Sequence, residues 1–220
     1  MKRRNGKWTG CICLVLVLAM AAGGIFVYMH NEKIKQNAYA VMVKTPYFSG
    51  QGVVYEKTDV GTFILTAGHV TEGMKAGDVC KVLFFGGQEA EAELYYVSET
   101  ADAAFLYVTD EKVPDGIVAV QKDRQKFDAL AEGDALYAVD FDGTRIEKTE
   151  GTLLSPWIYL EDFSLDMMLV RLSCQNGMSG CGIVDRKGSL VGILCGSSTE
   201  KEAALLPLSV IESEWIMAKP

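Results

Sequence analysis

The sequence beyond residue 38 is built from short apolar runs that are separated by Gly, Asp and Thr. Val, Ile, Tyr, Phe and Thr are frequent in these runs, and the spacing is about 8–12 residues, which is typical of an all-β sandwich or barrel. The expected strands are Tyr39–Lys44, Gly52–Glu56, Thr62–Thr66, Val79–Phe85, Ala92–Val97, Ala104–Val108, Asp134–Val139, Thr149–Leu153, Trp157–Leu160, Met167–Leu172, Gly182–Val184 and Leu190–Cys195.

Two segments differ from this pattern. Leu208–Ala218 has apolar residues near helical spacing, including Ile211 and Trp215, which predicts a helix over 208–218. The polar stretch Pro114–Lys126 predicts the boundary between two β units.

An uncharged apolar run of 18 residues, 12–29, lies near the N-terminus. A helix of this length spans about 27 Å, close to the hydrocarbon thickness of a bilayer. The basic cluster Lys2–Lys7 precedes the run, and basic residues favour the cytoplasmic side. We therefore expect a protein of the cytoplasmic membrane, with its N-terminus inside. Its expected parts are a cytoplasmic tail (1–10), a single transmembrane helix (11–29), a linker (30–38) and an extracytoplasmic domain (39–220).

A cleaved signal peptide is the alternative to the anchor. Ala38-Tyr39-Ala40 has the A-x-A pattern of a cleavage site. The polar segment Asn31–Asn37 sets this pattern unusually far from the apolar run, so the sequence favours the anchor.

The charge and the metal-binding residue types exclude several functions. The 220 residues carry a net charge of −8, whereas a general nucleic-acid-binding protein needs a basic surface. Residues 1–40 carry six basic residues and one acidic residue, a net +5, so the remaining residues carry −13. The chain has two His and no C-x-x-C motif, so we expect no metal site and no cofactor. Four cysteines outside the membrane segment allow three pairings, and the sequence does not choose among them: Cys80, Cys174, Cys181 and Cys195.

Two motifs place a histidine and an aspartate beside apolar strands. His69 follows the run Thr62–Thr66 and is the only imidazole of the domain that can act as a base near neutral pH, although a lone histidine is often structural. Asp102 precedes the run Ala104–Val108. It can be a simple turn residue, or it can accept a hydrogen bond from an imidazole and fix its tautomer.

A third motif surrounds a serine with glycines, from Gly177 through Ser179 to Gly182. A tight turn of this kind exposes the hydroxyl, and its N–H groups can bind an oxyanion, although a glycine-rich hairpin turn would look similar. A serine becomes a nucleophile when a base removes its proton, and the base needs an orienting acid. The chain supplies one residue for each role, in the order His, Asp, Ser.

With these three motifs the sequence resembles the trypsin-like serine proteases of the chymotrypsin fold, in particular the bacterial HtrA/DegS-like branch. The matching stretches are 49–70, 85–108 and 176–196, with a looser likeness over 39–217. The resemblance implies two packed antiparallel six-stranded β-barrels, at about 39–113 and 127–205, followed by the helix 208–218. It places the active site in the cleft between the barrels.

The resemblance also implies the catalytic roles. His69 would be the general base, Asp102 its orienting acid and Ser179 the nucleophile. The N–H groups of Gly177 and Ser179 would form the oxyanion hole.

The specificity pocket is read from the same resemblance. Ser173, six residues before the nucleophile, would lie at the pocket floor, with Cys195 and Gly196 in the wall. Because the floor residue is not Asp or Glu, we expect a small or medium apolar side chain before the scissile bond rather than Lys or Arg.

The sequence departs from the family at several positions. Met178 stands where Asp or Asn is usual, so activation by pairing with a newly cut N-terminus is not expected, and the support of the oxyanion loop is open. Cys181 replaces a common Gly. Cys174 and Cys195 would lie near the pocket, either as a disulfide or as free thiols. The chain ends at Pro220, too soon after these motifs for the PDZ domain that HtrA relatives usually carry.

These features together predict a membrane-anchored serine endopeptidase that hydrolyses a polypeptide substrate through an acyl-enzyme. The alternative is a catalytically silent protease-fold module that binds a partner or signals. Intact His69, Asp102 and Ser179 favour the enzyme, whereas Met178 keeps the alternative open. HtrA relatives often assemble as trimers, but the sequence leaves the oligomeric state open.

Overall fold

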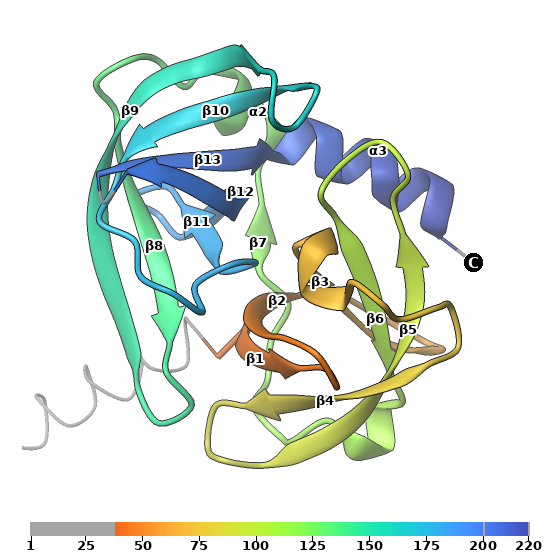
Figure 1. Cartoon of the computed structure of the whole chain (residues 1–220). Coiled ribbons are helices and arrows are strands. Elements are labelled where there is room, and N and C mark those ends of the chain that lie inside the picture. Colours follow the sequence, from red (N-terminus) through yellow and green to blue (C-terminus); the bar gives the residue numbers. More distant parts are fainter. Residues whose placement is uncertain (1–37, 200, 220) are drawn as a thin grey trace, which may run out of the picture. The chain divides into compact units, whose positions relative to one another are not determined.

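The computed structural model describes residues 38–199 and 201–219 (Figure 1). The expected tail, transmembrane helix and nearly all of the linker fall in residues 1–37, outside the described part of the chain. The A-x-A residues of the alternative, 38–40, are described: all three are buried, and Ala40 begins the first strand. Within the described residues, no helix is long and apolar enough to cross a membrane.

The first barrel consists of six strands that close in the order β1-β2-β3-β6-β5-β4. The sheet closes because β1 pairs with both β2 and β4. Strands near the surface turn alternate side chains inward and outward. In β5 the glutamates Glu89, Glu91 and Glu93 are exposed, while the apolar residues that follow each of them are buried. The strands are β1 (Ala40–Lys44), β2 (Ser49–Thr58), β3 (Gly61–Thr66), β4 (Val79–Phe84), β5 (Glu89–Val97) and β6 (Ala104–Val108).

The second barrel also has six antiparallel strands, in the order β11-β8-β9-β10-β13-β12, and closes because β11 pairs with β12 as well as with β8. A two-residue strand, β7 (Gln121–Lys122), adds to β12 in parallel. The barrel strands are β8 (Ala135–Phe141), β9 (Ile146–Leu160), β10 (Leu165–Arg171), β11 (Gly182–Val184), β12 (Ser189–Thr199) and β13 (Glu202–Pro207).

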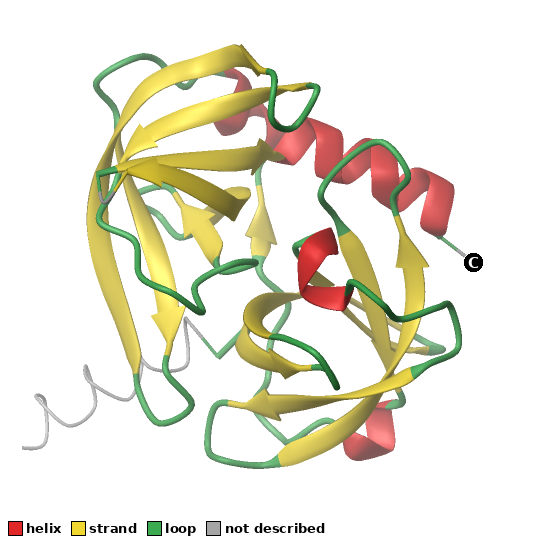
Figure 2. Ribbon diagram, viewed as in Figure 1, coloured by secondary structure: helices red, strands yellow, loops and turns green. Residues whose placement is uncertain are grey.

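The expectation of two six-stranded antiparallel barrels and a C-terminal helix is confirmed (Figure 2). The structure corrects it in detail. The expected strands Thr149–Leu153 and Trp157–Leu160 are parts of one long strand, β9. Its pairing with β10 shifts register between Ser155 and Ile158, which leaves Pro156 inside a bulge. A proline has no N–H for the sheet, and a bulge does not require one.

Strand β13 was not expected from the sequence. Its residues are mainly Ala and Leu, which favour helices, and the segment leads directly into a helix. Pairing with β10 on one side and β12 on the other makes it a strand. The short helix α2 (Arg124–Asp128) and the 3₁₀ turns at Gly68–Thr71 and Asp110–Lys112 were also not expected.

The C-terminal helix α3 (Leu208–Ala218) leaves the second barrel at β13 and packs against the first barrel (Figure 1). The Trp215 ring lies 4.8 Å from the Phe63 ring, 4.9 Å from Phe105 and 5.7 Å from Tyr55, measured between centroids. Aromatic pairs at such distances stabilise packing beyond the area that they bury. The helix therefore holds the two barrels together.

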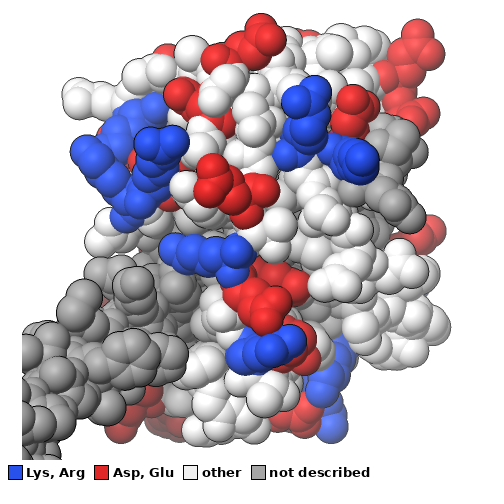
Figure 3. All heavy atoms as spheres, turned by 90° about the vertical axis from the view of Figure 1, so that its left-hand side faces the viewer, with Lys and Arg blue, Asp and Glu red and all other residues white. Residues whose placement is uncertain are grey.

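The surface charge is mixed on the side of the molecule that carries β8 and β9. Figure 3 shows Lys and Arg side chains interspersed with Asp and Glu side chains on this face. Among the described residues on this face, Lys and Arg side chains therefore form no extended patch of their own.

Candidate active site

Strand pairing brings His69 and Asp102 together. His69 lies in the 3₁₀ turn Gly68–Thr71 that follows β3, and Asp102 lies just before β6. In the antiparallel pairing of these strands, Thr66 at the end of β3 is opposite Ala104 at the start of β6. The turn and the aspartate therefore meet at the same end of the barrel.

The Asp102 carboxylate holds His69 at two points. One oxygen, Oδ2, lies 2.8 Å from the His69 Nδ1, and the other accepts the His69 backbone N–H at 2.8 Å. The carboxylate is only an acceptor, so it selects the tautomer with the proton on Nδ1 and leaves Nε2 free to take a proton. The imidazole is 43% exposed, whereas the Asp102 side chain is 13% exposed.

This contact changes the acidity of both groups. The hydrogen bond that the His69 Nδ1–H donates to Asp102 raises the pKa of His69 above its ordinary value, although partial burial opposes the shift. Burial acts to raise the pKa of Asp102, but the hydrogen bonds and charge of His69 outweigh it, so that pKa is lowered. The pair therefore favours an ionised carboxylate.

The backbone of Ser179 packs against β2, which pairs with the strand that leads to the His69 turn. Its carbonyl oxygen accepts the Gln51 N–H at 2.7 Å. A Cβ atom on Gly50 would lie 2.8 Å from the same oxygen and 2.6 Å from Val70, the residue after His69. Only a glycine allows β2 to pass between the Ser179 segment and the His69 turn at this distance.

Gly180 makes a second close approach. Its φ is +86°, and a Cβ atom there would clash with the Gln51 carbonyl oxygen and lie 3.0 Å from the Ala67 nitrogen. The structure thus brings His69 and Asp102 into direct contact and brings Ser179 and Gly180 against the residues that flank His69.

The turn before Ser179 leaves two N–H groups available. Gly177 has a φ of +91°, with open space where a side chain would be. Met178 is buried, its N–H donates to the Gln175 carbonyl oxygen, and its own carbonyl oxygen accepts the Cys181 N–H. Within the described part of the chain, neither the Gly177 nor the Ser179 N–H donates a hydrogen bond. A turn with two unused donors can bind a developing oxyanion.

The three residues expected in the specificity pocket lie in different surroundings. Gly196 lines a cavity of about 410 Å³, where a Cβ atom on it would lie 3.3 Å from the Phe163 ring. Ser173 is exposed, and neither it nor Cys195 lines this cavity. The buried Cys195 thiol instead lies 3.6 Å from the Asp102 carbonyl oxygen, to which it can donate.

Sequence reasoning missed several residues of this region. Gln51 was not singled out, although a polar residue between two glycines in a buried strand is a usable signal. The turn between β9 and β10, which supplies Glu161, Asp162 and Phe163 to the cavity, carries no motif.

The cysteines and metal-ligand types offer no further reactive group in the described residues. The four cysteines in residues 38–199 are free thiols. Burial raises the pKa of Cys80 to about 11, and raises that of Cys181 and Cys195 well above the ordinary value, so these thiols stay protonated. No group of three or more His, Cys, Asp or Glu in the described residues could hold a metal ion.

Comparisons with known proteins agree with this geometry. The family profile described as a trypsin-like peptidase domain matches residues 50–193. No match was found among curated protein sequences.

Solved structures resemble the fold. The Rv3671c protease from M. tuberculosis in its active form is 17% identical, with a TM-score of 0.67, covering 84% of this chain and 82% of that chain. The HtrA-type protease AlgW, solved with a tripeptide, is 22% identical with a TM-score of 0.69, covering 85% of this chain but 62% of its own. A serine endoprotease from Yersinia pestis is 20% identical with a TM-score of 0.64, covering 82% and 64%. At these identities the likeness concerns the fold.

The His69–Asp102 contact leads to a titration prediction. We expect His69 to titrate above pH 6.5 and to lose part of this shift in Asp102→Asn, because the amide carries no charge to stabilise the imidazolium. The measurement is an NMR titration of the imidazole resonances, with His69→Gln to assign them. The same His69 pKa in wild type and Asp102→Asn would contradict the described electrostatics.

Proposed function

The chain belongs to the trypsin-like peptidase family as a serine endopeptidase, and we propose that His69, Asp102 and Ser179 carry out its reaction. The observation that supports this most is the double contact of Asp102 with His69 beside the segment of Ser179. The two unused N–H groups of Gly177 and Ser179 add the oxyanion site that such a reaction needs.

The first half of the reaction forms an acyl-enzyme. The Ser179 Oγ attacks the carbonyl carbon of the scissile peptide bond while the His69 Nε2 takes the hydroxyl proton. The carbonyl oxygen becomes an oxyanion, which the Gly177 and Ser179 N–H groups bind. When the tetrahedral intermediate collapses, the C–N bond breaks and His69 gives its proton to the leaving amine.

The second half releases the product. A water molecule attacks the acyl carbon, His69 takes its proton, and Ser179 leaves with a proton returned by His69. Asp102 stays ionised throughout and stabilises the imidazolium that forms twice in the cycle. Its lowered pKa suits this role.

The substrate is a polypeptide in this proposal. AlgW, which shares the fold, was solved with a tripeptide and with a decapeptide. Gly196 follows the buried part of β12, next to a cavity with apolar lining from Leu160, Phe163 and Leu169. Glu161 and Asp162 line the same cavity, so the specificity needs a direct test.

We expect cleavage after small or medium apolar residues, because the proposed floor residue Ser173 is uncharged. A peptide library cleaved by the full chain measures this preference. The variant Glu161→Gln/Asp162→Asn tests the acidic residues of the cavity, and it should keep the preference for an apolar residue before the scissile bond. A profile dominated by Arg or Lys would refute the expectation.

The proposal includes an anchor in the cytoplasmic membrane through residues 11–29. Its support is the uncharged apolar run and the basic cluster before it, which favour a cytoplasmic N-terminus and an extracytoplasmic protease domain.

Alkaline extraction of membranes tests the anchor. The full chain should stay in the pellet, whereas Leu18→Arg/Met20→Arg should release it, since each arginine near the helix centre costs about 2.5–3.5 kcal/mol. Recovery of a soluble wild-type form cut near Ala38 would show a signal peptide instead.

Labelling with a fluorophosphonate probe tests the nucleophile. The purified full chain should react at Ser179, and Ser179→Ala should abolish the reaction because the probe requires an activated hydroxyl. His69→Gln should reduce it strongly because the general base is lost.

The labelling result distinguishes the enzyme from the alternative, a catalytically silent binding module, which the uncharged Met178 leaves open. Ser209→Ala serves as a control that keeps every proposed catalytic group and should label like wild type. Folded wild-type protein that takes up no probe between pH 6 and 9 would favour the silent module.

A further inference from the structure

The groups that the proposed reaction uses come from both barrels. His69 and Asp102 lie at the ends of β3 and β6 in the first barrel, and Ser179 lies before β11 of the second. A misplacement on the order of 1 Å between reacting groups can cost about 10²-fold in rate. Contacts between the two barrels beside Ser179 therefore affect the reaction rate, because they set the distance between the reacting groups.

Gln51 uses all of its polar groups, and three of the four bond to the second barrel, while its carbonyl oxygen bonds within the first. It is 4% exposed, its N–H donates to the Ser179 carbonyl oxygen, and its own carbonyl oxygen accepts the Thr66 hydroxyl at 2.6 Å. Its side-chain Oε1 accepts the Phe141 N–H at 2.9 Å. This bond fixes the orientation of the amide, because an N–H can pair only with the oxygen. The amide Nε2 therefore faces Asp140, whose Oδ1 accepts it at 2.5 Å.

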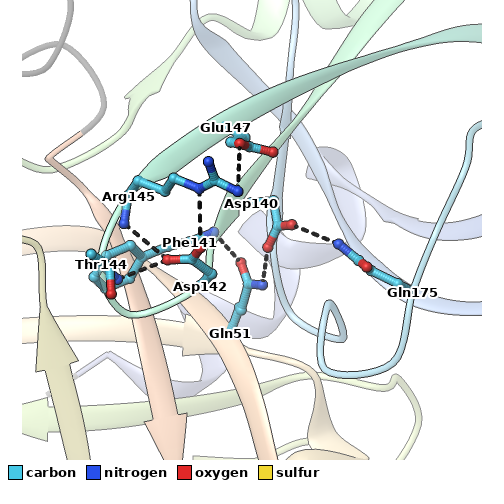
Figure 4. Close-up of polar contacts among 8 residues, drawn as sticks. All are labelled: Gln51, Asp140, Phe141, Asp142, Thr144, Arg145, Glu147 and Gln175. Atoms are coloured by element: carbon cyan, nitrogen blue, oxygen red, sulfur yellow. Dashed lines mark hydrogen bonds and ion pairs between the residues drawn. The ribbon is translucent and has the colours of Figure 1, made fainter.

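Asp140 joins this amide to a second one. It lies near the end of β8, and Figure 4 shows its carboxylate between the side chains of Gln51 and Gln175. The second oxygen, Oδ2, accepts the Gln175 Nε2 at 3.4 Å. A carboxylate is only an acceptor, so one group can bind both amides.

Gln175 begins the turn that ends at Ser179. Its carbonyl oxygen accepts the Met178 N–H, and its own N–H lies 3.3 Å from the Met178 sulfur. After Ser179 the turn is tied to the second barrel, where the Gly180 N–H donates to the Leu194 carbonyl oxygen at 2.7 Å. Before Ser179 it carries Gly177, which is exposed and has open space where a side chain would be. The side chain of Gln175 thus adds a link from the start of this turn to Asp140 of β8.

We propose that Asp140 is a positioning residue for the oxyanion site. Its carboxylate connects Gln51 of the first barrel to Gln175, and thereby holds the Gly177 and Ser179 N–H groups in line with the His69 turn. This inference rests on the proposed serine-protease reaction. The same connection would support the shape of the turn, in which Met178 stands where the family usually has Asp or Asn.

The neighbouring Asp142 provides a matched control. It lies two residues further along the chain and also accepts several bonds, but these come from Thr144 and Arg145 within its own hairpin (Figure 4). Asp142→Ala removes a carboxylate at the same place in the barrel without touching Gln51 or Gln175.

The experiment measures the rate of fluorophosphonate labelling of the full chain, at a temperature where each variant is folded by circular dichroism. Asp140→Ala and Gln175→Leu should each slow labelling by about tenfold or more, because complete loss of an oxyanion donor costs about 10²–10³-fold. The pH midpoint of labelling should not move, since His69 and Asp102 keep their contact. Asp142→Ala should label at the wild-type rate.

Two further variants test the link itself. The double variant Asp140→Ala/Gln175→Leu should be no slower than the slower single variant, because both changes break the same connection. Asp140→Asn should retain most of the rate, since its oxygen can accept from Gln51 and its N–H can donate to a turned Gln175 amide.

The outcomes decide the inference separately from the proposed function. Labelling of the wild-type protein establishes that Ser179 is an activated nucleophile. If the folded variants Asp140→Ala and Gln175→Leu then label at the wild-type rate, the positioning role of Asp140 is overturned. The positioning role would also be overturned if the double variant slowed labelling by the product of the two single-variant effects. If Asp140→Ala fails to fold, Gln175→Leu decides alone, because Gln175 is exposed and its change leaves the Gln51–Asp140 contact intact.

Discussion

The hydrogen bond from the Gln51 N–H to the Ser179 carbonyl oxygen joins the two barrels where the proposed reaction takes place. From Gln51 the connection continues through its carbonyl oxygen to Thr66, the last residue of β3 before the turn of His69. Gly50 and Gly180 make this approach possible, because a side chain at either position would meet backbone atoms. The arrangement of the site depends on this contact, since Ser179 belongs to one barrel and His69 to the other.

Burial gives this junction its specificity. Leaving a buried polar group without a partner costs about 1–3 kcal/mol, so Gln51 favours only an arrangement in which Asp140 and Phe141 bond to its side chain.

The C-terminal helix adds a second constraint, on the segment that carries Asp102. Its buried Glu214 accepts hydrogen bonds from Tyr96 and Thr100, and Thr100 lies two residues before Asp102. Polar contacts thus hold the segments of both Ser179 and Asp102.

The departures from the family pattern have a common physical meaning. Met178 is buried, and a carboxylate at that position would lose its hydration and require a partner. Cys181, which replaces a common Gly, is buried as well, and burial raises the pKa of its thiol so that it adds no charge. In both places an uncharged side chain fills the space, and the polar network of Gln51, Asp140 and Gln175 lies beside the turn instead.

The sequence by itself determined most strands, the helix over 208–218 and the three motifs of His69, Asp102 and Ser179. Strand periodicity and turn glycines are local patterns, so they can be identified from the sequence without knowing the tertiary structure. The transmembrane helix remains a prediction, because its residues lie outside the described structure. Only the tertiary structure decided that β13 is a strand, that β9 runs through Pro156, and which residues line the cavity beside Gly196. It also decided the pairing of Gln51 with Asp140, which are 89 residues apart, because such a contact follows from barrel packing and leaves no local pattern.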